Sequence, residues 1–148
     1  MLGRSMLRLR SAIGLVIFSS MISIPVVAQA DAIAERKANF KANAAAIKAI
    51  NGALGGGDFD AVIEQATTIA NWARVMPNYF PENSDSGDTK ARADIWMDFD
   101  GFKGRASANE PAALTLIITA KTGDVAATIG ASKALGGTCK SCHDNYKD

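Results

Sequence analysis

The chain has 148 residues, of which 48% are hydrophobic, and a formal net charge of +1 at pH 7. No basic stripe runs along it, which argues against a nucleic-acid-binding protein. Alanine is abundant, runs of β-branched residues are short, and no clear alternation of polar and apolar residues occurs. The composition therefore favours helices over strands.

The first thirty residues have the features of a secretory signal peptide. A basic start with three arginines precedes an apolar run over 12–27 and the small-x-small pattern Ala28-Gln29-Ala30. The run is shorter than the roughly 20 residues that a membrane span requires. We therefore expect 1–30 to be cleaved, leaving one domain over 31–148 with no membrane segment. That domain has 13 basic and 15 acidic residues, hence a net charge of −2.

Apolar residues in the mature chain recur at helical spacing in four stretches. The stretches cover about 31–54, 58–75, 91 to the turn at 122–124, and 124–146, with a long polar connection over 77–90. Pro111 lacks an amide hydrogen, so a kink or break is expected near 108–110. The pattern predicts an all-α fold: an antiparallel, up-down-up-down four-helix bundle with one longer loop between helices two and three.

A Cys-x-x-Cys-His motif near the end contains both cysteines and the only histidine of the chain. In an exported chain this motif is typical of covalent haem attachment. A thiol-disulfide motif normally follows a strand, and a closed zinc site needs a fourth ligand. We therefore predict one haem c, with Cys139 and Cys142 forming thioethers and His143 as the proximal ligand of the iron.

The presence of a single histidine also restricts which residue can be the sixth ligand of the iron. A second histidine is not available within one chain, which leaves methionine, lysine or a small molecule from solution. The mature chain has two methionines, Met76 and Met97. Ordinary packing is the more common role for such residues, and ligation of the iron is the alternative.

Two basic residues are further candidates for the haem site. Arg36 lies on the apolar seam of the first helix, where a buried arginine needs an anionic partner such as a haem propionate. The alternative is a rim arginine paired with a nearby Asp or Glu. Lys147 follows His143 by four residues and so lies on the same helical face. It lies either near the proximal side of the haem or at a solvated chain end.

Three segments of the chain carry a family resemblance. They are Tyr79-Phe80-Pro81-Glu82-Asn83-Ser84, Lys90-Ala91-Arg92-Ala93-Asp94-Ile95-Trp96 and Thr138-Cys139-Lys140-Ser141-Cys142-His143-Asp144. Together they resemble the cytochrome c′ and cytochrome c-556 group, the class II c-type cytochromes, over nearly all of 31–148. The resemblance implies a four-helix bundle with the haem motif on its last helix.

The resemblance also implies roles for two residues of the first helix. The arginine of the family matches Arg36, and the distal residue four positions later matches Phe40. Low-spin members have an iron-binding methionine at the distal position, which phenylalanine cannot replace. An open iron face of the c′ kind is therefore implied, roofed by an apolar ring that would admit NO and CO. The alternative is a low-spin, c-556-like electron carrier with Met76 or Met97 as sixth ligand.

The expected protein is a periplasmic mono-haem cytochrome of a Gram-negative bacterium, with gas binding and possible electron transfer. Enzymatic turnover of the peroxidase kind would need a polar distal acid or base, which Phe40 does not provide. A redox partner protein is expected without being identified. By resemblance, the protein is expected to form a homodimer through its first two helices.

Overall fold

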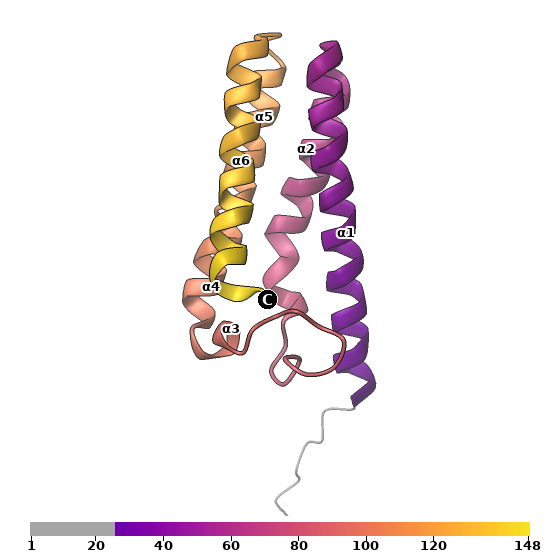
Figure 1. Ribbon diagram of the computed structural model, residues 1–148, viewed down its shortest axis with the longest axis vertical. Coiled ribbons are helices and arrows are strands. Elements are labelled where there is room, and N and C mark those ends of the chain that lie inside the picture. Colours follow the sequence, from indigo (N-terminus) through magenta and orange to yellow (C-terminus); the bar gives the residue numbers. More distant parts are fainter. Residues whose placement is uncertain (1–25) are drawn as a thin grey trace, which may run out of the picture.

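The computed structural model describes residues 26–148, with side chains from residue 31 onward (Figure 1). Its elements are α1 (Val26–Gly56), α2 (Phe59–Val75), the 3-10 turn η1 (Met76–Tyr79), α3 (Asp94–Met97), α4 (Phe99–Ser107), α5 (Asn109–Ala120) and α6 (Val125–Tyr146). Most of the expected signal peptide lies outside the described residues, so its cleavage stays a prediction. Among the described helices, none has the length and apolar character needed to cross a membrane.

The helices form the predicted four-helix bundle, with α3, α4 and α5 together making its third arm. α1 packs on α2, α2 on α5, and α5 on α6. The α1–α2 and α5–α6 turns lie at one end of the bundle, while the long loop and the C-terminus lie at the other (Figure 1). The all-α fold class is thereby confirmed.

Short polar side chains fix the starts of α2 and α6. Asp58 accepts a hydrogen bond from the backbone N–H of Ala61 at 3.0 Å, and Asp124 accepts one from Ala127 at 2.9 Å. Each aspartate satisfies an N–H group that would otherwise have no partner in the first turn. Both helices begin within a residue of the position that the sequence predicts.

The third arm is more interrupted than the sequence predicts. A break between α4 and α5 falls at residue 108, where Pro111 led us to expect one, but a second break at Asp98 was not predicted. Asp98 leaves the helical region (φ −132°, ψ 58°) and its carboxylate accepts from the N–H of Gly101 at 3.1 Å. A Cβ atom at Gly101 would collide with that carboxylate, so a larger residue there would require the Asp98 side chain to shift.

The C-terminus is fastened to the end of the long loop. Ala91 and Lys147 form an isolated antiparallel bridge, and the N–H of Arg92 donates to the carbonyl of Tyr146 at 3.1 Å. These bonds hold residues 90–92 in an extended conformation, so the third arm starts at Asp94 rather than near Ala91 as predicted. Short-range periodicity could not show this pairing, because its partners lie more than fifty residues apart.

The core is divided into two clusters along the bundle. The cluster near the two tight turns is aliphatic, built from alanine, valine, isoleucine and leucine. The cluster near the long loop contains four aromatic residues among its eight members: Trp72, Met76, Phe80, Ile95, Phe102, Ala106, Cys142 and Tyr146. Rigid aromatic rings at the loop end can form the wall of a cavity, whereas flexible side chains would fill it.

We expect Asp98→Ala to lower the free energy of unfolding by about 1–2 kcal/mol, because the substitution removes the α4 cap and a further bond. That bond runs from the hydroxyl of Tyr146 to Asp98 at 3.0 Å. Urea denaturation followed by circular dichroism measures the change. Asp100→Ala is the matched control, since Asp100 is exposed and contacts only Lys103 through an ion pair. Equal midpoints for the two variants would contradict this role of Asp98.

Candidate haem-binding site

A cavity of about 870 Å³ opens between α1 and α6 at the loop end of the bundle. Its volume lies in the ~300–1,000 Å³ range of small-molecule and cofactor sites. Its apolar wall consists mainly of Phe40, Ile47, Trp72, Met76, Phe80, Ile95 and Phe102. Every helix from α1 to α6, the turn η1 and the long loop contribute to it, so the cavity is a property of the whole bundle.

The last turns of α6 bring the predicted attachment residues to this cavity. Cys139, Cys142 and His143 all line it, and both cysteines are free thiols. Burial raises the pKa of both thiols, which keeps them protonated at neutral pH. Cys139 donates to the side-chain oxygen of Asn109 at 3.3 Å, and Thr138 donates to the same oxygen at 2.8 Å. Asn109 thus orients the start of the motif from the break between α4 and α5.

His143 is open to the cavity and is electrostatically suited to bind a metal. Partial burial lowers its pKa, and the positive charge of Lys147 lowers it further. Both effects favour the neutral imidazole, which is the form that coordinates iron. Lys147 is exposed and also lines the cavity, and its place near the proximal side of a haem stays a prediction.

Phe40 faces His143 across the cavity. The two ring centroids lie 6.3 Å apart with an interplanar angle of 67°. The phenyl ring is held edge-on by Trp72 at 5.6 Å and by Phe80 at 6.4 Å. This separation lies within the ~4.5–7 Å range of aromatic pairs, so the two rings would move apart to receive a haem between them.

Arg36 is buried, with 2% of its surface exposed, and binds the long loop. Its terminal nitrogens donate to the hydroxyl and carbonyl of Ser84 at 2.8 and 2.6 Å, and to Thr89 at 2.7 Å. A fourth bond reaches the carbonyl of Tyr79 at 3.2 Å, and the guanidinium lies 4.6 Å from the ring centroid of Phe80. One side chain of α1 thereby binds the chain at three positions between Tyr79 and Thr89.

The charge of Arg36 has only neutral partners in the described chain. No carboxylate of residues 31–148 forms an ion pair with it, so the alternative of a rim arginine paired with Asp or Glu does not describe this side chain. Burial accordingly lowers the pKa of the guanidinium. Arg36 lines the cavity, and its pairing with a haem propionate stays a prediction.

The two candidate methionines lie in different environments. Met76 is 3% exposed and lines the cavity, so it remains available to the low-spin alternative. Met97 is 80% exposed and does not line the cavity. The structure therefore leaves Met76 as the methionine candidate.

The residues of this cavity fit a haem c. Two thiols and an imidazole on one face supply the attachment groups, and the opposite wall is aromatic. Two buried polar atoms in the described residues lack a hydrogen-bond partner, the side-chain oxygen of Asn43 and the indole nitrogen of Trp72. Both residues line the cavity. Orphaned polar atoms beside a cavity are expected where a bound group and its waters complete the wall.

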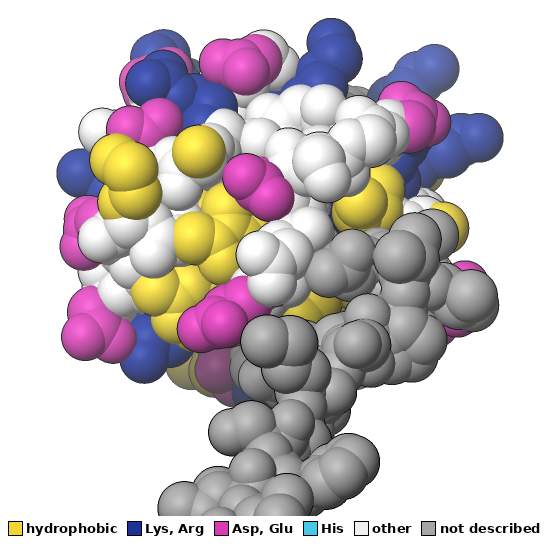
Figure 2. Space-filling model, turned by 90° about the horizontal axis from the view of Figure 1, so that it is seen from below, with side chains coloured by type: hydrophobic (Ala, Val, Ile, Leu, Met, Phe, Trp, Pro, Cys, Tyr) yellow, Lys and Arg dark blue, Asp and Glu magenta, His cyan; other side chains and the backbone are white. Residues whose placement is uncertain are grey.

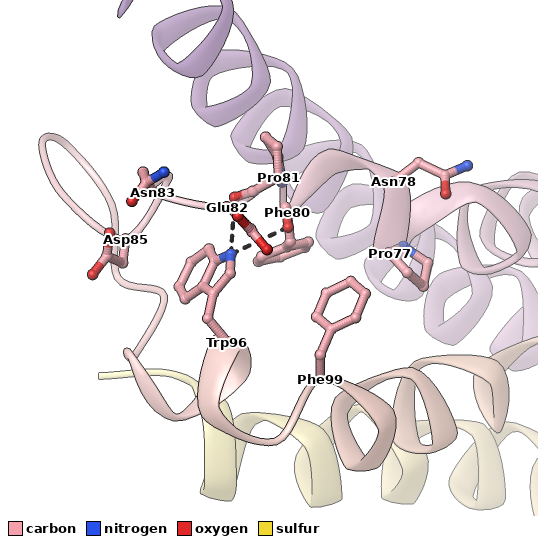
Figure 3. A pocket seen from close by; sticks show the side chains of 9 residues that line it. All are labelled: Pro77, Asn78, Phe80, Pro81, Glu82, Asn83, Asp85, Trp96 and Phe99. Atoms are coloured by element: carbon pink, nitrogen blue, oxygen red, sulfur yellow. Dashed lines mark hydrogen bonds between the residues drawn. The ribbon is translucent and has the colours of Figure 1, made fainter. Parts of the chain in front are cut away.

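A second hollow of about 600 Å³ lies on the other side of Phe80, between the long loop and α3 (Figure 3). Pro81, Glu82, Asp85, Trp96 and Phe99 help to line it. The indole nitrogen of Trp96 donates to the carbonyls of Phe80 and Pro81 at 3.2 and 2.8 Å, which ties the loop to α3. Viewed from the loop end, hydrophobic side chains are visible with acidic ones beside them (Figure 2).

A cavity lined by the Cys-x-x-Cys-His motif, on the last helix of a four-helix bundle, defines a class II c-type cytochrome. The chain belongs to the cytochrome c′ family: residues 31–147 match the family described as Cytochrome C'. Members of this family bind haem c covalently, and Cys139 and Cys142 are the two cysteines that this chain offers for it.

Similar proteins agree in sequence and in fold. The chain is 36% identical to cytochrome c′ of Rhodopseudomonas palustris over 95% of this chain and 96% of the relative. It is 42% identical to cytochrome c′ of Rhodospirillum rubrum, over 57% of this chain and 58% of that protein's length. The solved structure of cytochrome c prime from Shewanella frigidimarina superposes with a TM-score of 0.74 at 32% identity, covering 81% of this chain and 96% of that chain.

We expect Arg36→Met to destabilise the fold by about 2–4 kcal/mol and to release the loop over 80–89. The substitution removes charge-assisted hydrogen bonds and leaves the buried carbonyl of Ser84 without the donor that Arg36 provides. Hydrogen exchange of the amide of Ser84, which donates to the carbonyl of Pro81, measures the local effect. Arg74→Met serves as control, since Arg74 is exposed and bonded only to Glu110. Unchanged exchange in Arg36→Met would show that the loop is held by other contacts.

Proposed function

We propose that this protein binds NO and CO at an open face of its haem iron, in the periplasm, with one-electron transfer as a second role. The proposal is carried by one observation, the apolar ring of Phe40 facing His143 across the cavity. The histidine occupies one side of the cavity, and the residue opposite it has no atom that can bind a metal. The signal peptide expected from the sequence and the bacterial relatives support export.

The residues of the chain have separate tasks in this proposal. Cys139 and Cys142 hold the haem through thioether bonds, and His143 binds the iron. When bound, the haem supplies an iron centre that accepts a diatomic ligand and changes oxidation state by one electron. Phe40 excludes water and offers no hydrogen bond, which favours small uncharged ligands over polar ones.

Phe40 also limits access to the open face. Its ring packs edge-on against Trp72 and Phe80, so a ligand that enters must displace the ring from these contacts. Aromatic pairs of this kind are worth about 0.5–1.5 kcal/mol beyond their buried area. The ring therefore slows entry while leaving the iron coordinatively open.

The proposal is tested by the absorption spectrum of the reduced holoprotein before and after addition of CO or NO. We expect the Soret band to shift on addition of either gas, because the sixth position is free. An unchanged spectrum at saturating gas would show that the position is closed and would overturn the proposal.

Substitutions at Phe40 test the same geometry. Phe40→Ala should accelerate CO binding by about tenfold, which corresponds to the removal of ~1.4 kcal/mol of barrier. Phe40→Met should instead give a six-coordinate, low-spin haem, with the far-red methionine–iron band in the oxidised spectrum and weakened CO binding. Stopped-flow mixing and absorption spectra measure these results. Phe99→Ala, at a ring outside the cavity, is the control.

A low-spin electron carrier is the second candidate function, since Met76 is buried in the cavity wall. The far-red methionine–iron band in the wild-type oxidised protein would favour it. Loss of that band in Met76→Leu, but not in Met97→Leu, would assign the ligand.

A homodimer through α1 and α2 is also proposed. Small exposed side chains on α1 would let a second helix approach closely; they are Ala34, Ala38, Ala42, Ala45 and Ala49. A related cytochrome c′ structure, 26% identical with a TM-score of 0.74, is described as having a ligand-controlled dimer dissociation. That behaviour belongs to the relative, and its presence in this protein is part of the proposal.

A further inference from the structure

Basic side chains gather at the mouth of the haem cavity. Of the 13 basic residues in 31–148, five line the cavity, whereas only one of the 15 acidic residues does. The basic residues are Arg36, Lys37, Lys41, Lys90 and Lys147, and the acidic one is Asp88. The side chains of the mouth thus sum to +4, in a domain whose own net charge is −2.

Most of this positive charge is not neutralised by the chain. Lys37 pairs with Asp88, but Lys41, Lys90 and Lys147 form no ion pair with any side-chain carboxylate in the described part of the protein. All three are exposed. Elsewhere on the surface, Lys103 and Lys140 each pair with an aspartate one helical turn away, whereas Lys48, Lys121 and Lys133 form no ion pair in the described residues. The mouth is therefore distinguished by the number of basic residues that gather there.

The backbone holds two of these lysines together. The Ala91–Lys147 bridge and the bond from the N–H of Asp148 to the carbonyl of Lys90, at 3.0 Å, place the loop end beside the C-terminus. Lys41 comes from α1, on the opposite side of the mouth. Adjacent like charges disfavour the folded state, so their placement around the cavity calls for an anionic partner.

Haem propionates alone do not balance this charge. A haem with two ionised propionates would leave the mouth at about +2, because the five basic residues and Asp88 sum to +4. Arg36 is buried and its terminal nitrogens bind the loop, so it is not available at the rim. Lys41 and Lys90 remain exposed at the rim, where they can meet another molecule.

We propose that the mouth of the haem cavity is the docking surface for an acidic redox protein, an inference that rests on the haem function proposed above. The rim lysines attract the acidic face of the partner and orient it over the cavity. One electron then passes between the two proteins: this haem iron changes between ferrous and ferric as the one-electron centre of the partner changes in the opposite sense. An acidic protein is favoured over a membrane, because charge complementarity is the feature that the rim offers and its lysines surround a cavity rather than a flat apolar face.

The sign of the local charge can be measured on the reduced holoprotein by stopped-flow oxidation with ferricyanide and with tris(phenanthroline)cobalt(III). We expect oxidation by the anion to slow by about tenfold as ionic strength rises from ~10 to ~200 mM, and oxidation by the cation to accelerate. If the net negative charge of the whole domain controlled the rates, oxidation by ferricyanide would accelerate with ionic strength and oxidation by the cobalt complex would slow. That pattern would overturn the proposal.

Two matched double variants locate the effect. Lys41→Gln/Lys90→Gln removes two rim charges, and Lys48→Gln/Lys133→Gln removes two exposed charges that do not line the cavity. At low salt we expect the rim variant to react at least ~5-fold more slowly with ferricyanide and the control to change less than ~2-fold. Equal rates for the two variants would contradict docking at the mouth.

A protein probe separates a docking surface from a site for small anions. At low salt, an acidic blue-copper protein should oxidise the reduced holoprotein about tenfold faster than a basic mono-haem cytochrome of similar potential, and Lys41→Gln/Lys90→Gln should abolish the difference. If ferricyanide alone responds to the rim, the mouth takes small anions and the docking proposal is wrong. Wild-type protein without covalent haem would overturn the proposed function itself, whereas haem-loaded protein with the wrong charge preference would overturn the docking alone.

Discussion

The buried guanidinium of Arg36 is the contact on which the haem end of the bundle depends. It joins α1 to the long loop through bonds to Tyr79, Ser84 and Thr89, and it stacks over Phe80. The loop over 80–93 is not helical, and Ser84 is fully buried. Its backbone groups need partners that no helix ladder supplies. An arginine provides several donors in a rigid fork, which is why one residue can organise so long a segment.

This anchor has a consequence for the cavity. With the loop held against α1, Phe80 forms one wall and the loop end reaches the C-terminal turn of α6. The bridge between Ala91 and Lys147 then closes the same end from the other side. α1 and α6 are thus linked through the loop at the end where the cavity separates them. A cavity with a firm frame can receive a large flat group without rebuilding the core, which lowers the cost of binding.

The sequence was most informative about features that depend on neighbours a few residues away. Helical periodicity, the caps at Asp58 and Asp124, and the Cys-x-x-Cys-His spacing are of this kind, and the fold class followed from them. The seam position of Arg36 singled out that residue, and the resemblance added the distal position of Phe40; the structure brings both to the same cavity as His143. Their contacts with haem are part of the proposed function.

The unpredicted features all depend on contacts across the bundle. Asp98 breaks the third arm because Gly101 leaves room for its carboxylate and Tyr146 donates to it, yet an aspartate inside a helical stretch looks unexceptional in sequence. Asn109 supports Cys139 from thirty residues away. Trp72 carries the apolar spacing of a core residue but lines the cavity. Periodicity identifies which face is buried, and it cannot tell whether that face meets a helix or a cofactor.

Phe80 separates two environments of opposite charge. The guanidinium of Arg36 lies 4.6 Å from its ring centroid and belongs to the basic cavity. The second hollow, which Phe80 also lines, contains Glu82 and Asp85 and no basic residue (Figure 3). Because Glu82 and Asp85 lie on the far side of this ring, Asp88 is the one acidic side chain of the loop at the mouth, and it pairs with Lys37. The same loop that closes the haem cavity therefore keeps its mouth positive in a domain whose net charge is negative.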